Sequence, residues 1–195
     1  MNLGRLAKIF GYSFVAIVVV MGAGPVRTLA QQEEQGHDHS GQSNTGGALM
    51  KAVRDATERF QDVSKAKAAG YALQFGCVTG SDSGAMGMHF VNGPLVNDGI
   101  IDVTRPEIVI YEPQPDGSLR LIGADFLVLA DQWNASHSGP PQLMGQLFHL
   151  FEAPNRFGLP AFYTLHVWAW KNNPNGGFTN WHPDVSCTSF SGTGQ

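Results

Sequence analysis

Two apolar segments joined by a short turn restrict the fold of this chain more than any other feature. Residues 106–113 read PEIVIYEP, and residues 119–130 read LRLIGADFLVLA. Between them lie Pro115, Asp116 and Gly117, which are residue types that favour a tight turn. The pattern predicts a β-hairpin and therefore an antiparallel sheet.

Further strands are expected on both sides of this hairpin. Residues 71–78 alternate partly between apolar and polar, and residues 86–92 form a short strand that contains Gly87, where another backbone or a ligand would approach closely. Residues 162–170 carry large side chains on both faces of a strand. Residues 131–160 are rich in Pro, Gly and polar residues, and irregular segments of this length in compact domains are often functional.

Helical periodicity precedes the strands. The apolar stripe consists of Leu49, Val53, Ala56 and Phe60. A second short helix is expected to start after Asp62, as its N-cap, and to end at Gly70. The predicted fold class is therefore α+β, with N-terminal helices packed on an antiparallel sheet that could curl into a barrel.

The first thirty residues have the pattern of an export signal. Arg5 and Lys8 precede an apolar segment, and Thr28 and Ala30 are small residues at the positions typical of cleavage after Ala30. An uncleaved anchor is the alternative, although the apolar segment is short for a span, which needs about 20 residues. We expect a signal peptide at residues 1–30, a periplasmic or secreted product, and no integral membrane span after cleavage.

Residues 31–47 are polar, rich in glycine and almost free of apolar side chains, which predicts a disordered linker. Within them, the sequence His37-Asp38-His39 could bind a metal weakly, but a solvated tail is the simpler interpretation, because binding would cost conformational entropy. Residues 48–195 are then expected to form a single α+β domain. The formal net charge is −4 without any cluster of Lys and Arg, so a nucleic-acid partner is not expected.

The chain has two cysteines, Cys77 and Cys187, one near each end of the expected domain. In an oxidising compartment such a pair predicts a disulfide that closes a long loop. Two free thiols are the alternative.

Several long motifs are conspicuous: GAMGMHFVN, PEIVIYEP, LRLIGADF, YTLHVWAWKNNPNGGF and the closing VSC, preceded by ATERFQDVSKAKAAGYA. Together they resemble a widespread family of exported bacterial proteins that has no assigned activity. The resemblance covers nearly all of the expected domain and implies export and a common fold, without supplying a reaction. Members of that family often carry asparagine where this chain has His182, so a shared role for His182 is not expected.

His166 lies in the middle of its strand, among tryptophans and other large side chains. Burial disfavours the charged form of an imidazole, and the neutral form is the one that binds metals. His89 lies in another predicted strand, and Glu112 shares a strand face with two isoleucines. A carboxylate on such a face needs a partner, because an unpaired buried charge is expensive.

One cation would satisfy all three groups. Two imidazoles and one carboxylate suit non-haem iron, and also zinc or copper. We therefore predict a mononuclear metal site made of His89, Glu112 and His166, with His149 as a weaker candidate ligand. The alternatives are that each histidine is a core residue bonded to a backbone carbonyl, and that Glu112 faces water or pairs with an arginine.

Two functions remain open from these residues. The first is an exported metal-dependent enzyme, such as an oxidoreductase, or a metal carrier. The second is a non-catalytic module that binds a small apolar or aromatic ligand, or a partner in the cell envelope, in a pocket lined by aromatic rings. Imidazole nitrogens of His89 and His166 within about 4–5 Å of one another, with Glu112 beside them, would favour the metal, because two bonds of roughly 2 Å span that gap, whereas a separation beyond about 8 Å would favour the binding module.

Overall fold

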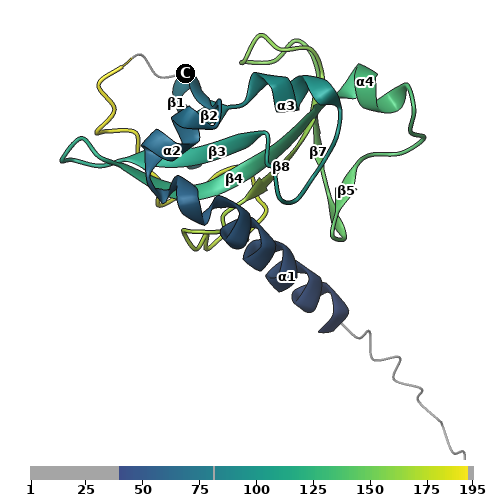
Figure 1. The fold of residues 1–195 in the computed structure, drawn as a ribbon, viewed down its shortest axis with the longest axis horizontal. Coiled ribbons are helices and arrows are strands. Elements are labelled where there is room, and N and C mark those ends of the chain that lie inside the picture. The colour runs from purple at the N-terminus through teal and green to yellow at the C-terminus, as the bar shows by residue number, and fades with distance from the viewer. Residues whose placement is uncertain (1–39, 81, 193–195) are drawn as a thin grey trace, which may run out of the picture. The chain divides into compact units, whose positions relative to one another are not determined.

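An antiparallel sheet of six strands, curled toward one face like half a barrel, carries the fold (Figure 1). The computed structural model describes residues 40–80 and 82–192, which belong to one unit spanning Asp38–Gln195. The order of the strands across the sheet is β1-β2-β3-β4-β8-β7. Their bounds are β1 Ala72–Gly80, β2 Gly84–Val91, β3 Ile108–Pro113, β4 Leu119–Leu129, β7 His149–Phe151 and β8 Phe162–Val167.

Short helices and one small hairpin surround this sheet. The helices are α1 Ser40–Thr57, the 3-10 helix η1 Glu58–Gln61, α2 Val63–Ala68, α3 Gly93–Asp98 and α4 Ala130–Asn134. The hairpin consists of β5 Gln142–Leu143 and β6 Gln146–Leu147. The predicted α+β class and antiparallel sheet are confirmed. Within the described part of the chain, no helix is both long and apolar enough to cross a membrane.

Helix α1 covers part of one face of the sheet. Its apolar stripe buries Leu49 and Val53 completely. These two side chains share a core cluster with Ala124 and Phe126 of β4 and with Leu165 and Val167 of β8. The predicted periodicity therefore marks the face of α1 that meets the sheet.

The start of α1 differs from the predicted boundary. The linker was expected to run from residue 31 to residue 47, whereas α1 already begins at Ser40. Once a helix is nucleated, each added residue gains a hydrogen bond at little further entropic cost, so a helix can extend into residues with weak helix propensity. The predicted signal peptide at 1–30 and the first part of the linker lie outside the described residues.

The predicted second helix is confirmed. The carboxylate of Asp62 accepts a hydrogen bond from the backbone N–H of Ser64 at 2.9 Å, which is the N-cap arrangement. The chain leaves α2 through Gly70, whose φ of +92° is unfavourable for residues with a Cβ. Tyr71 follows directly, and β1 begins at the next residue.

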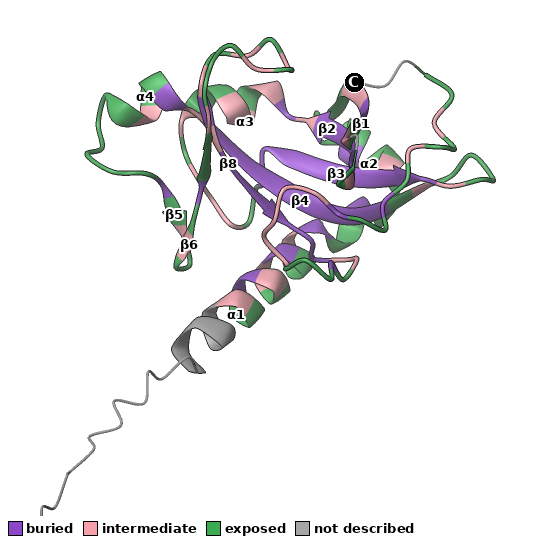
Figure 2. Ribbon diagram, turned by 180° about the vertical axis from the view of Figure 1, so that it is seen from behind, coloured by how far each residue is buried: buried purple, intermediate pink, exposed green. Residues whose placement is uncertain are grey.

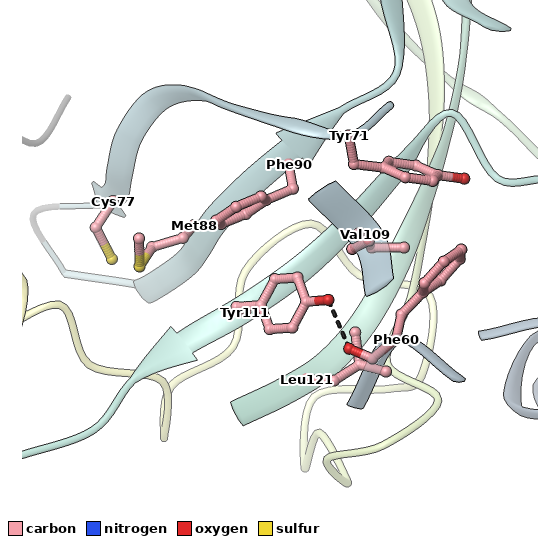
Figure 3. Packing of buried hydrophobic residues seen from close by; sticks show 9 residues of the cluster. Phe60, Tyr71, Cys77, Met88, Phe90, Val109, Tyr111 and Leu121 are labelled. Carbon is pink, nitrogen blue, oxygen red and sulfur yellow. Dashed lines mark hydrogen bonds between the residues drawn. The ribbon is translucent and has the colours of Figure 1, made fainter. Parts of the chain in front are cut away.

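A second core cluster joins η1 and α2 to the other half of the sheet (Figure 3). The ring of Phe60 meets that of Tyr71 edge-on at 5.2 Å, and Phe90 meets Tyr111 at 5.0 Å. The Tyr111 hydroxyl donates a hydrogen bond to the carbonyl of Phe60 at 2.6 Å, drawn as the dashed line in Figure 3. The buried tyrosine thus places its polar end on a helix carbonyl and its ring in the core.

Strands β3 and β4 are buried on both faces, as the continuous purple ribbon of Figure 2 shows. Helices cover one face, and the loops that follow β7 and β8 cover the other. This explains why both strands read as nearly unbroken apolar runs rather than as alternating sequences. Because both faces are buried, polar side chains on either face of these strands need a hydrogen-bond or charge partner within the protein.

Residues 131–160 are less irregular than expected, because they contain α4, the β5–β6 hairpin and β7. Strand β7 pairs with β8 through His149 and Thr164 and extends the sheet by one short edge strand. The strand predicted at residues 162–170 ends at Val167. Residues 152–160 remain a loop, which follows β7 directly.

The predicted disulfide is confirmed. Cys77 of β1 is bonded to Cys187 near the C-terminus, at a sequence separation of 110. Cys77 is fully buried in the cluster drawn in Figure 3. The bond thus holds the C-terminal segment to the first edge of the sheet.

We expect the double substitution Cys77→Ala and Cys187→Ala to lower the free energy of unfolding by about 4 kcal/mol, because the cross-link restricts a long loop in the unfolded chain. Denaturant unfolding followed by tryptophan fluorescence measures this difference. The wild type in the presence of reductant is the matched control and should behave like the variant. Equal midpoints for the oxidised wild type and the variant would contradict the expectation.

Candidate metal centre

Three polar side chains from three different strands converge on the face of the sheet opposite α1. They are His89 of β2, Asp125 of β4 and His166 of β8. Asp125 and His166 are direct partners in the β4–β8 ladder, and His89 is opposite Ile110 of β3. Since partners in an antiparallel ladder project to the same side, the register sends all three toward one face.

The curl of the sheet brings the two histidines together. Strands β3 and β4 separate β2 from β8, so in a flat sheet three strand spacings would put the backbones about 14 Å apart. The imidazole nitrogens Nε2 of His89 and Nε2 of His166 are nevertheless only 3.4 Å apart. The distance meets the part of the sequence-based criterion that concerns the two histidines, but Glu112, which the criterion also required, is not beside them.

Asp125 completes the group. Its Oδ1 lies 3.6 Å from Nδ1 of His166, and one donor atom of each of the three residues lies within 4.8 Å of the others. The exposed fractions are 6% for His89, 2% for Asp125 and 3% for His166. A carboxylate and two imidazoles so far from solvent must be satisfied by one another or by a bound ion.

Neighbouring groups fix the orientation of His89. Its Nδ1 lies 3.3 Å from the carbonyl oxygen of Gly87, and a carbonyl only accepts, so Nδ1 carries the hydrogen and Nε2 carries the lone pair. Gly87 has a φ of +87°, and a Cβ there would lie 2.7 Å from the carbonyl oxygen of Tyr111. The close approach predicted at Gly87 is therefore a backbone contact. This hydrogen bond alone would equally suit a core histidine.

His166 is the residue that distinguishes the two interpretations. Among the described residues its buried Nδ1 has no hydrogen-bond partner, and neither has the nearby Oδ1 of Asn180. The Oδ1 of Asp125, 3.6 Å from Nδ1, favours a hydrogen on that nitrogen. Nε2 of His166 then carries a lone pair that faces the lone pair of His89 Nε2. Two facing lone pairs require a cation or a proton between them.

An added proton, which would charge one imidazole, is a poor solution because the site is dry; the neutral tautomer of His166 with its hydrogen on Nε2 would instead donate to His89 and corresponds to the core-histidine alternative. Burial lowers the pKa of His89 to about 4, with a further decrease from His166. Burial also lowers the pKa of His166 to about 3, and His149 lowers it further. Burial raises the pKa of Asp125 to about 6, while His89 and the hydrogen bond from Thr164 lower it. Near pH 7 the group therefore consists of two neutral imidazoles and one carboxylate, which is the protonation state that metals require.

The spacing also fits a metal ion. Bonds of 2.0–2.1 Å at a tetrahedral angle would put two nitrogens about 3.4 Å apart, and the observed distance between the Nε2 atoms is 3.4 Å. Asp125 is placed to serve as the third donor, since one of its oxygens lies within 4.8 Å of a donor nitrogen of each histidine. Three protein ligands from one face of a sheet leave the opposite side of the ion open.

The carboxylate of this group is Asp125 and not the predicted Glu112. Glu112 does share its strand face with Ile108 and Ile110, but it lies four residues beyond Ile108, the β3 partner of Asp125. Four residues of strand amount to about 13 Å. Position along the strand therefore separates Glu112 from the row that contains Asp125 and His166.

Glu112 instead pairs with Lys171. The Lys171 ammonium lies 2.8 Å and 2.9 Å from the two carboxylate oxygens, and the backbone N–H of Ser186 donates to Oε1 at 3.2 Å. The expectation of a cationic partner was sound, but the partner is a lysine and not an arginine. The ion pair joins β3 to the C-terminal segment near the disulfide.

Asp125 was missed although the sequence contained a signal for it. It is the sole acidic residue in the apolar run from Leu121 to Ala130, which is long enough to be buried on both faces. The same argument that selected Glu112 applies more strongly there, because a carboxylate within a doubly buried strand has no access to solvent. Pairing with His166 could not be deduced, since the order of the strands is not encoded locally.

The remaining histidine candidates lie outside the group. His149 is exposed on β7 opposite Thr164, and it is close enough to lower the pKa of His166. His182 is fully buried, and its Nδ1 accepts a hydrogen bond from the backbone of Asp184 at 3.1 Å. His149 therefore lies at the margin of the site, and His182 has a separate structural contact.

Glu107 is a second buried carboxyl group near the site. Its Oε2 accepts a hydrogen bond from the backbone N–H of Leu127 at 3.0 Å, just beyond the pair of Ile108 and Asp125. Burial raises its pKa to about 8, although two backbone hydrogen bonds lower it and the charge of Asp125 adds to the rise. Glu107 is thus a structural carboxyl group that is largely protonated near neutral pH.

No protein family, curated protein or solved structure matches this chain. The chemistry of the site must therefore be argued from its own geometry.

We expect Glu112→Gln to leave metal binding unchanged while lowering the free energy of unfolding by about 3 kcal/mol, because it leaves Lys171 without its carboxylate. Asp125→Asn, in contrast, should abolish metal binding. Isothermal titration with a divalent metal and denaturant unfolding measure the two effects on the same samples. Loss of binding in Glu112→Gln, with binding retained in Asp125→Asn, would restore Glu112 as the ligand.

We expect Glu107 to make the fold less stable as the pH rises. Its pKa in the folded chain is about 8, above the ordinary value of 4.5, so its stabilising contribution is complete below about pH 4.5 and is lost as the pH rises through about 8. The loss should amount to roughly 3–5 kcal/mol. Glu107→Gln, which mimics the protonated form, should be more stable than the wild type at pH 9 and similar at pH 5 in urea unfolding. If the free energies of unfolding of Glu107→Gln and of the wild type differed by the same amount at pH 5 and at pH 9, the expectation would be contradicted.

Proposed function

We propose that this chain binds one divalent metal ion through His89, Asp125 and His166 and that it acts as an exported metal-dependent oxidoreductase. Two imidazoles and one carboxylate on one side of an ion, with open positions on the other, are typical of non-haem iron(II) centres. The same donors also bind zinc or copper. The facial arrangement is most typical of iron(II), whereas the affinity order of divalent metals puts copper and zinc above iron.

The facing Nε2 atoms of His89 and His166 carry this proposal. They lie 3.4 Å apart, the tautomer of His89 is fixed by Gly87, and the Oδ1 of Asp125 beside His166 Nδ1 favours the same tautomer there. Both nitrogens are then acceptors in a buried site. A cation between them converts a repulsive contact into two coordinate bonds.

Charge balance supports the same conclusion. Asp125 has no cationic side chain from lysine or arginine among its described salt-bridge partners, and its hydrogen bond from Thr164 is neutral. Leaving a carboxylate in such a place is costly, whereas a divalent ion would compensate its charge. Glu112, by contrast, already has Lys171 and needs no ion.

Export is part of the proposal. The disulfide between Cys77 and Cys187 supports it, because such bonds persist in oxidising compartments and are rare in the cytosol. In such a compartment, a ligand set without cysteine avoids competition between metal binding and oxidation of a thiol.

The alternative is a non-catalytic module that binds a small apolar ligand. The observation in its favour is the wall beside the three ligands, which is built mainly from phenylalanine and aliphatic side chains. Under this alternative the histidines would share a hydrogen bond in the core, and added metal would have no effect.

Elemental analysis of the purified protein tests the proposal. We expect about one equivalent of a divalent metal after reconstitution. In Asp125→Asn and in His166→Gln the affinity should fall at least about 100-fold. Glu112→Gln and the exposed His137→Ala are matched controls that should keep the metal.

Metal should also raise the melting temperature of the wild type but not that of Asp125→Asn, because ligands stabilise the state they bind. Circular dichroism and the intact disulfide would confirm that each variant is folded. A folded wild-type protein that retains neither iron, zinc nor copper would refute the metal centre and leave the apolar module.

A further inference from the structure

A small cavity of about 30 Å³ lies directly beside the three ligands. Its walls are Phe75, Met86, Ile108, Leu127, Phe151, Phe157, Leu159, Phe162 and Thr164, together with His89, Asp125 and His166. Apart from the ligands, Thr164 is the one polar residue in this wall, and its hydroxyl already donates to Asp125. The cavity therefore offers a guest the open side of the metal centre and otherwise apolar surface.

The cavity is partly covered by side chains that join the two edges of the sheet. Strands β1 and β7 are the edge strands, and the loop of residues 152–160 crosses from β7 toward β1. On this loop the ring of Phe157 lies 5.4 Å from that of Phe75 in β1 and 6.2 Å from that of Phe162 in β8. These aromatic side chains thus cover the cavity between the two edge strands, which are not hydrogen-bonded to each other in the six-stranded sheet. We call this cover the lid.

Two features hold this lid in place. Arg156 donates a hydrogen bond from Nη1 to the carbonyl oxygen of Thr79 in β1 at 2.8 Å. Phe75 has a φ of +63°, which is unfavourable for a residue with a Cβ, and it lies in a bulge of β1 between Gln74 and Cys77. Bulges of this kind redirect a side chain, and here the redirected ring lines the cavity. Strain of this kind tends to persist where the surrounding structure imposes it.

We propose that this cavity admits an uncharged ligand of one or two heavy atoms, of the size and polarity of dioxygen, to the open side of the metal centre, and that Phe157 excludes larger molecules. The proposal rests on the metal centre proposed above and names the class of ligand that it takes.

The size limit follows from the volume. A cavity of about 30 Å³ holds only one or two water-sized groups. A ring or a longer chain would have to displace Phe157, which packs against both Phe75 and Phe162. Because packed aromatic rings resist overpacking, a larger guest loses affinity rather than deforming the wall.

The polarity limit follows from the wall. An anion in the cavity would lose its hydration and find no side-chain donor, because Thr164 is committed to Asp125. The divalent ion outweighs the charge of Asp125, so the limit on anions rests on this loss of hydration and not on repulsion. A neutral guest loses little hydration and keeps the dispersion contacts with the rings.

A first experiment tests the cavity without any metal. Xenon, an uncharged and apolar probe, is added to metal-free wild type and to metal-free Asp125→Asn, and methyl signals are followed by NMR. We expect shifts for Ile108, Leu127 and Leu159, which line the cavity, and none for Leu49 and Val53 on the helix side of the sheet. Absence of shifts at the cavity methyls would overturn the cavity as an apolar ligand site, whatever the metal does.

A second experiment uses protein loaded with iron(II). We expect nitric oxide, an uncharged diatomic, to bind and give the electron paramagnetic resonance signal of an iron–nitrosyl adduct. Azide, a small anion, and imidazole, a larger neutral molecule, should bind weakly. Phe157→Ala should strengthen imidazole binding at least about tenfold by removing the steric limit, with azide unaffected.

Phe178→Ala is the matched control, because Phe178 packs against the helix-side cluster and is not part of the cavity wall. It should leave imidazole binding weak. Tight imidazole binding to the wild type, or equal binding to the wild type and to Phe157→Ala, would overturn the size limit, and tight azide binding would overturn the polarity limit. Failure of iron to load at all, with xenon still bound, would instead refute the metal centre.

Discussion

Two imidazoles whose strands would be about 14 Å apart in a flat sheet meet at 3.4 Å because the sheet curls toward one face. The curl also brings the edge strands close enough for the ring of Phe157 to reach that of Phe75. Twist and bulges produce such curvature, and the register of β1 with β2 and of β3 with β4 is broken by bulges. The metal centre and the lid formed by the aromatic rings therefore both depend on the curl of the sheet.

The helices hold that bend from the opposite face. Leu49 and Val53 of α1 pack under β4 and β8, and Phe60 of η1 packs under β3, where the Tyr111 hydroxyl also anchors its carbonyl. Because strand residues alternate, the apolar neighbours of Asp125 and His166 supply this core while the polar residues face the other way. Packing on one face thus positions donor atoms on the other without any direct contact between helix and site.

Much of this could be read from the sequence, but not the part that depends on strand order. The hairpin, the N-cap at Asp62, the disulfide and the burial of His166 follow from local patterns and from spacing. The choice of carboxylate does not, because Glu112 and Asp125 are both acidic residues in apolar strands. Only the register, which pairs Asp125 with His166 and sends Glu112 toward Lys171, separates them. Register arises from long-range pairing, which a local pattern does not contain.

The closure between β1 and the loop after β7 differs in kind from the rest of the sheet. Every other junction between neighbouring strands is a ladder of backbone hydrogen bonds, whereas this one depends on aromatic rings and on one arginine that reaches Thr79. Side chains change rotamer in picoseconds to nanoseconds, while separating a paired strand requires local unfolding. Displacing these side chains would therefore open the half-barrel along this line without breaking a strand pair.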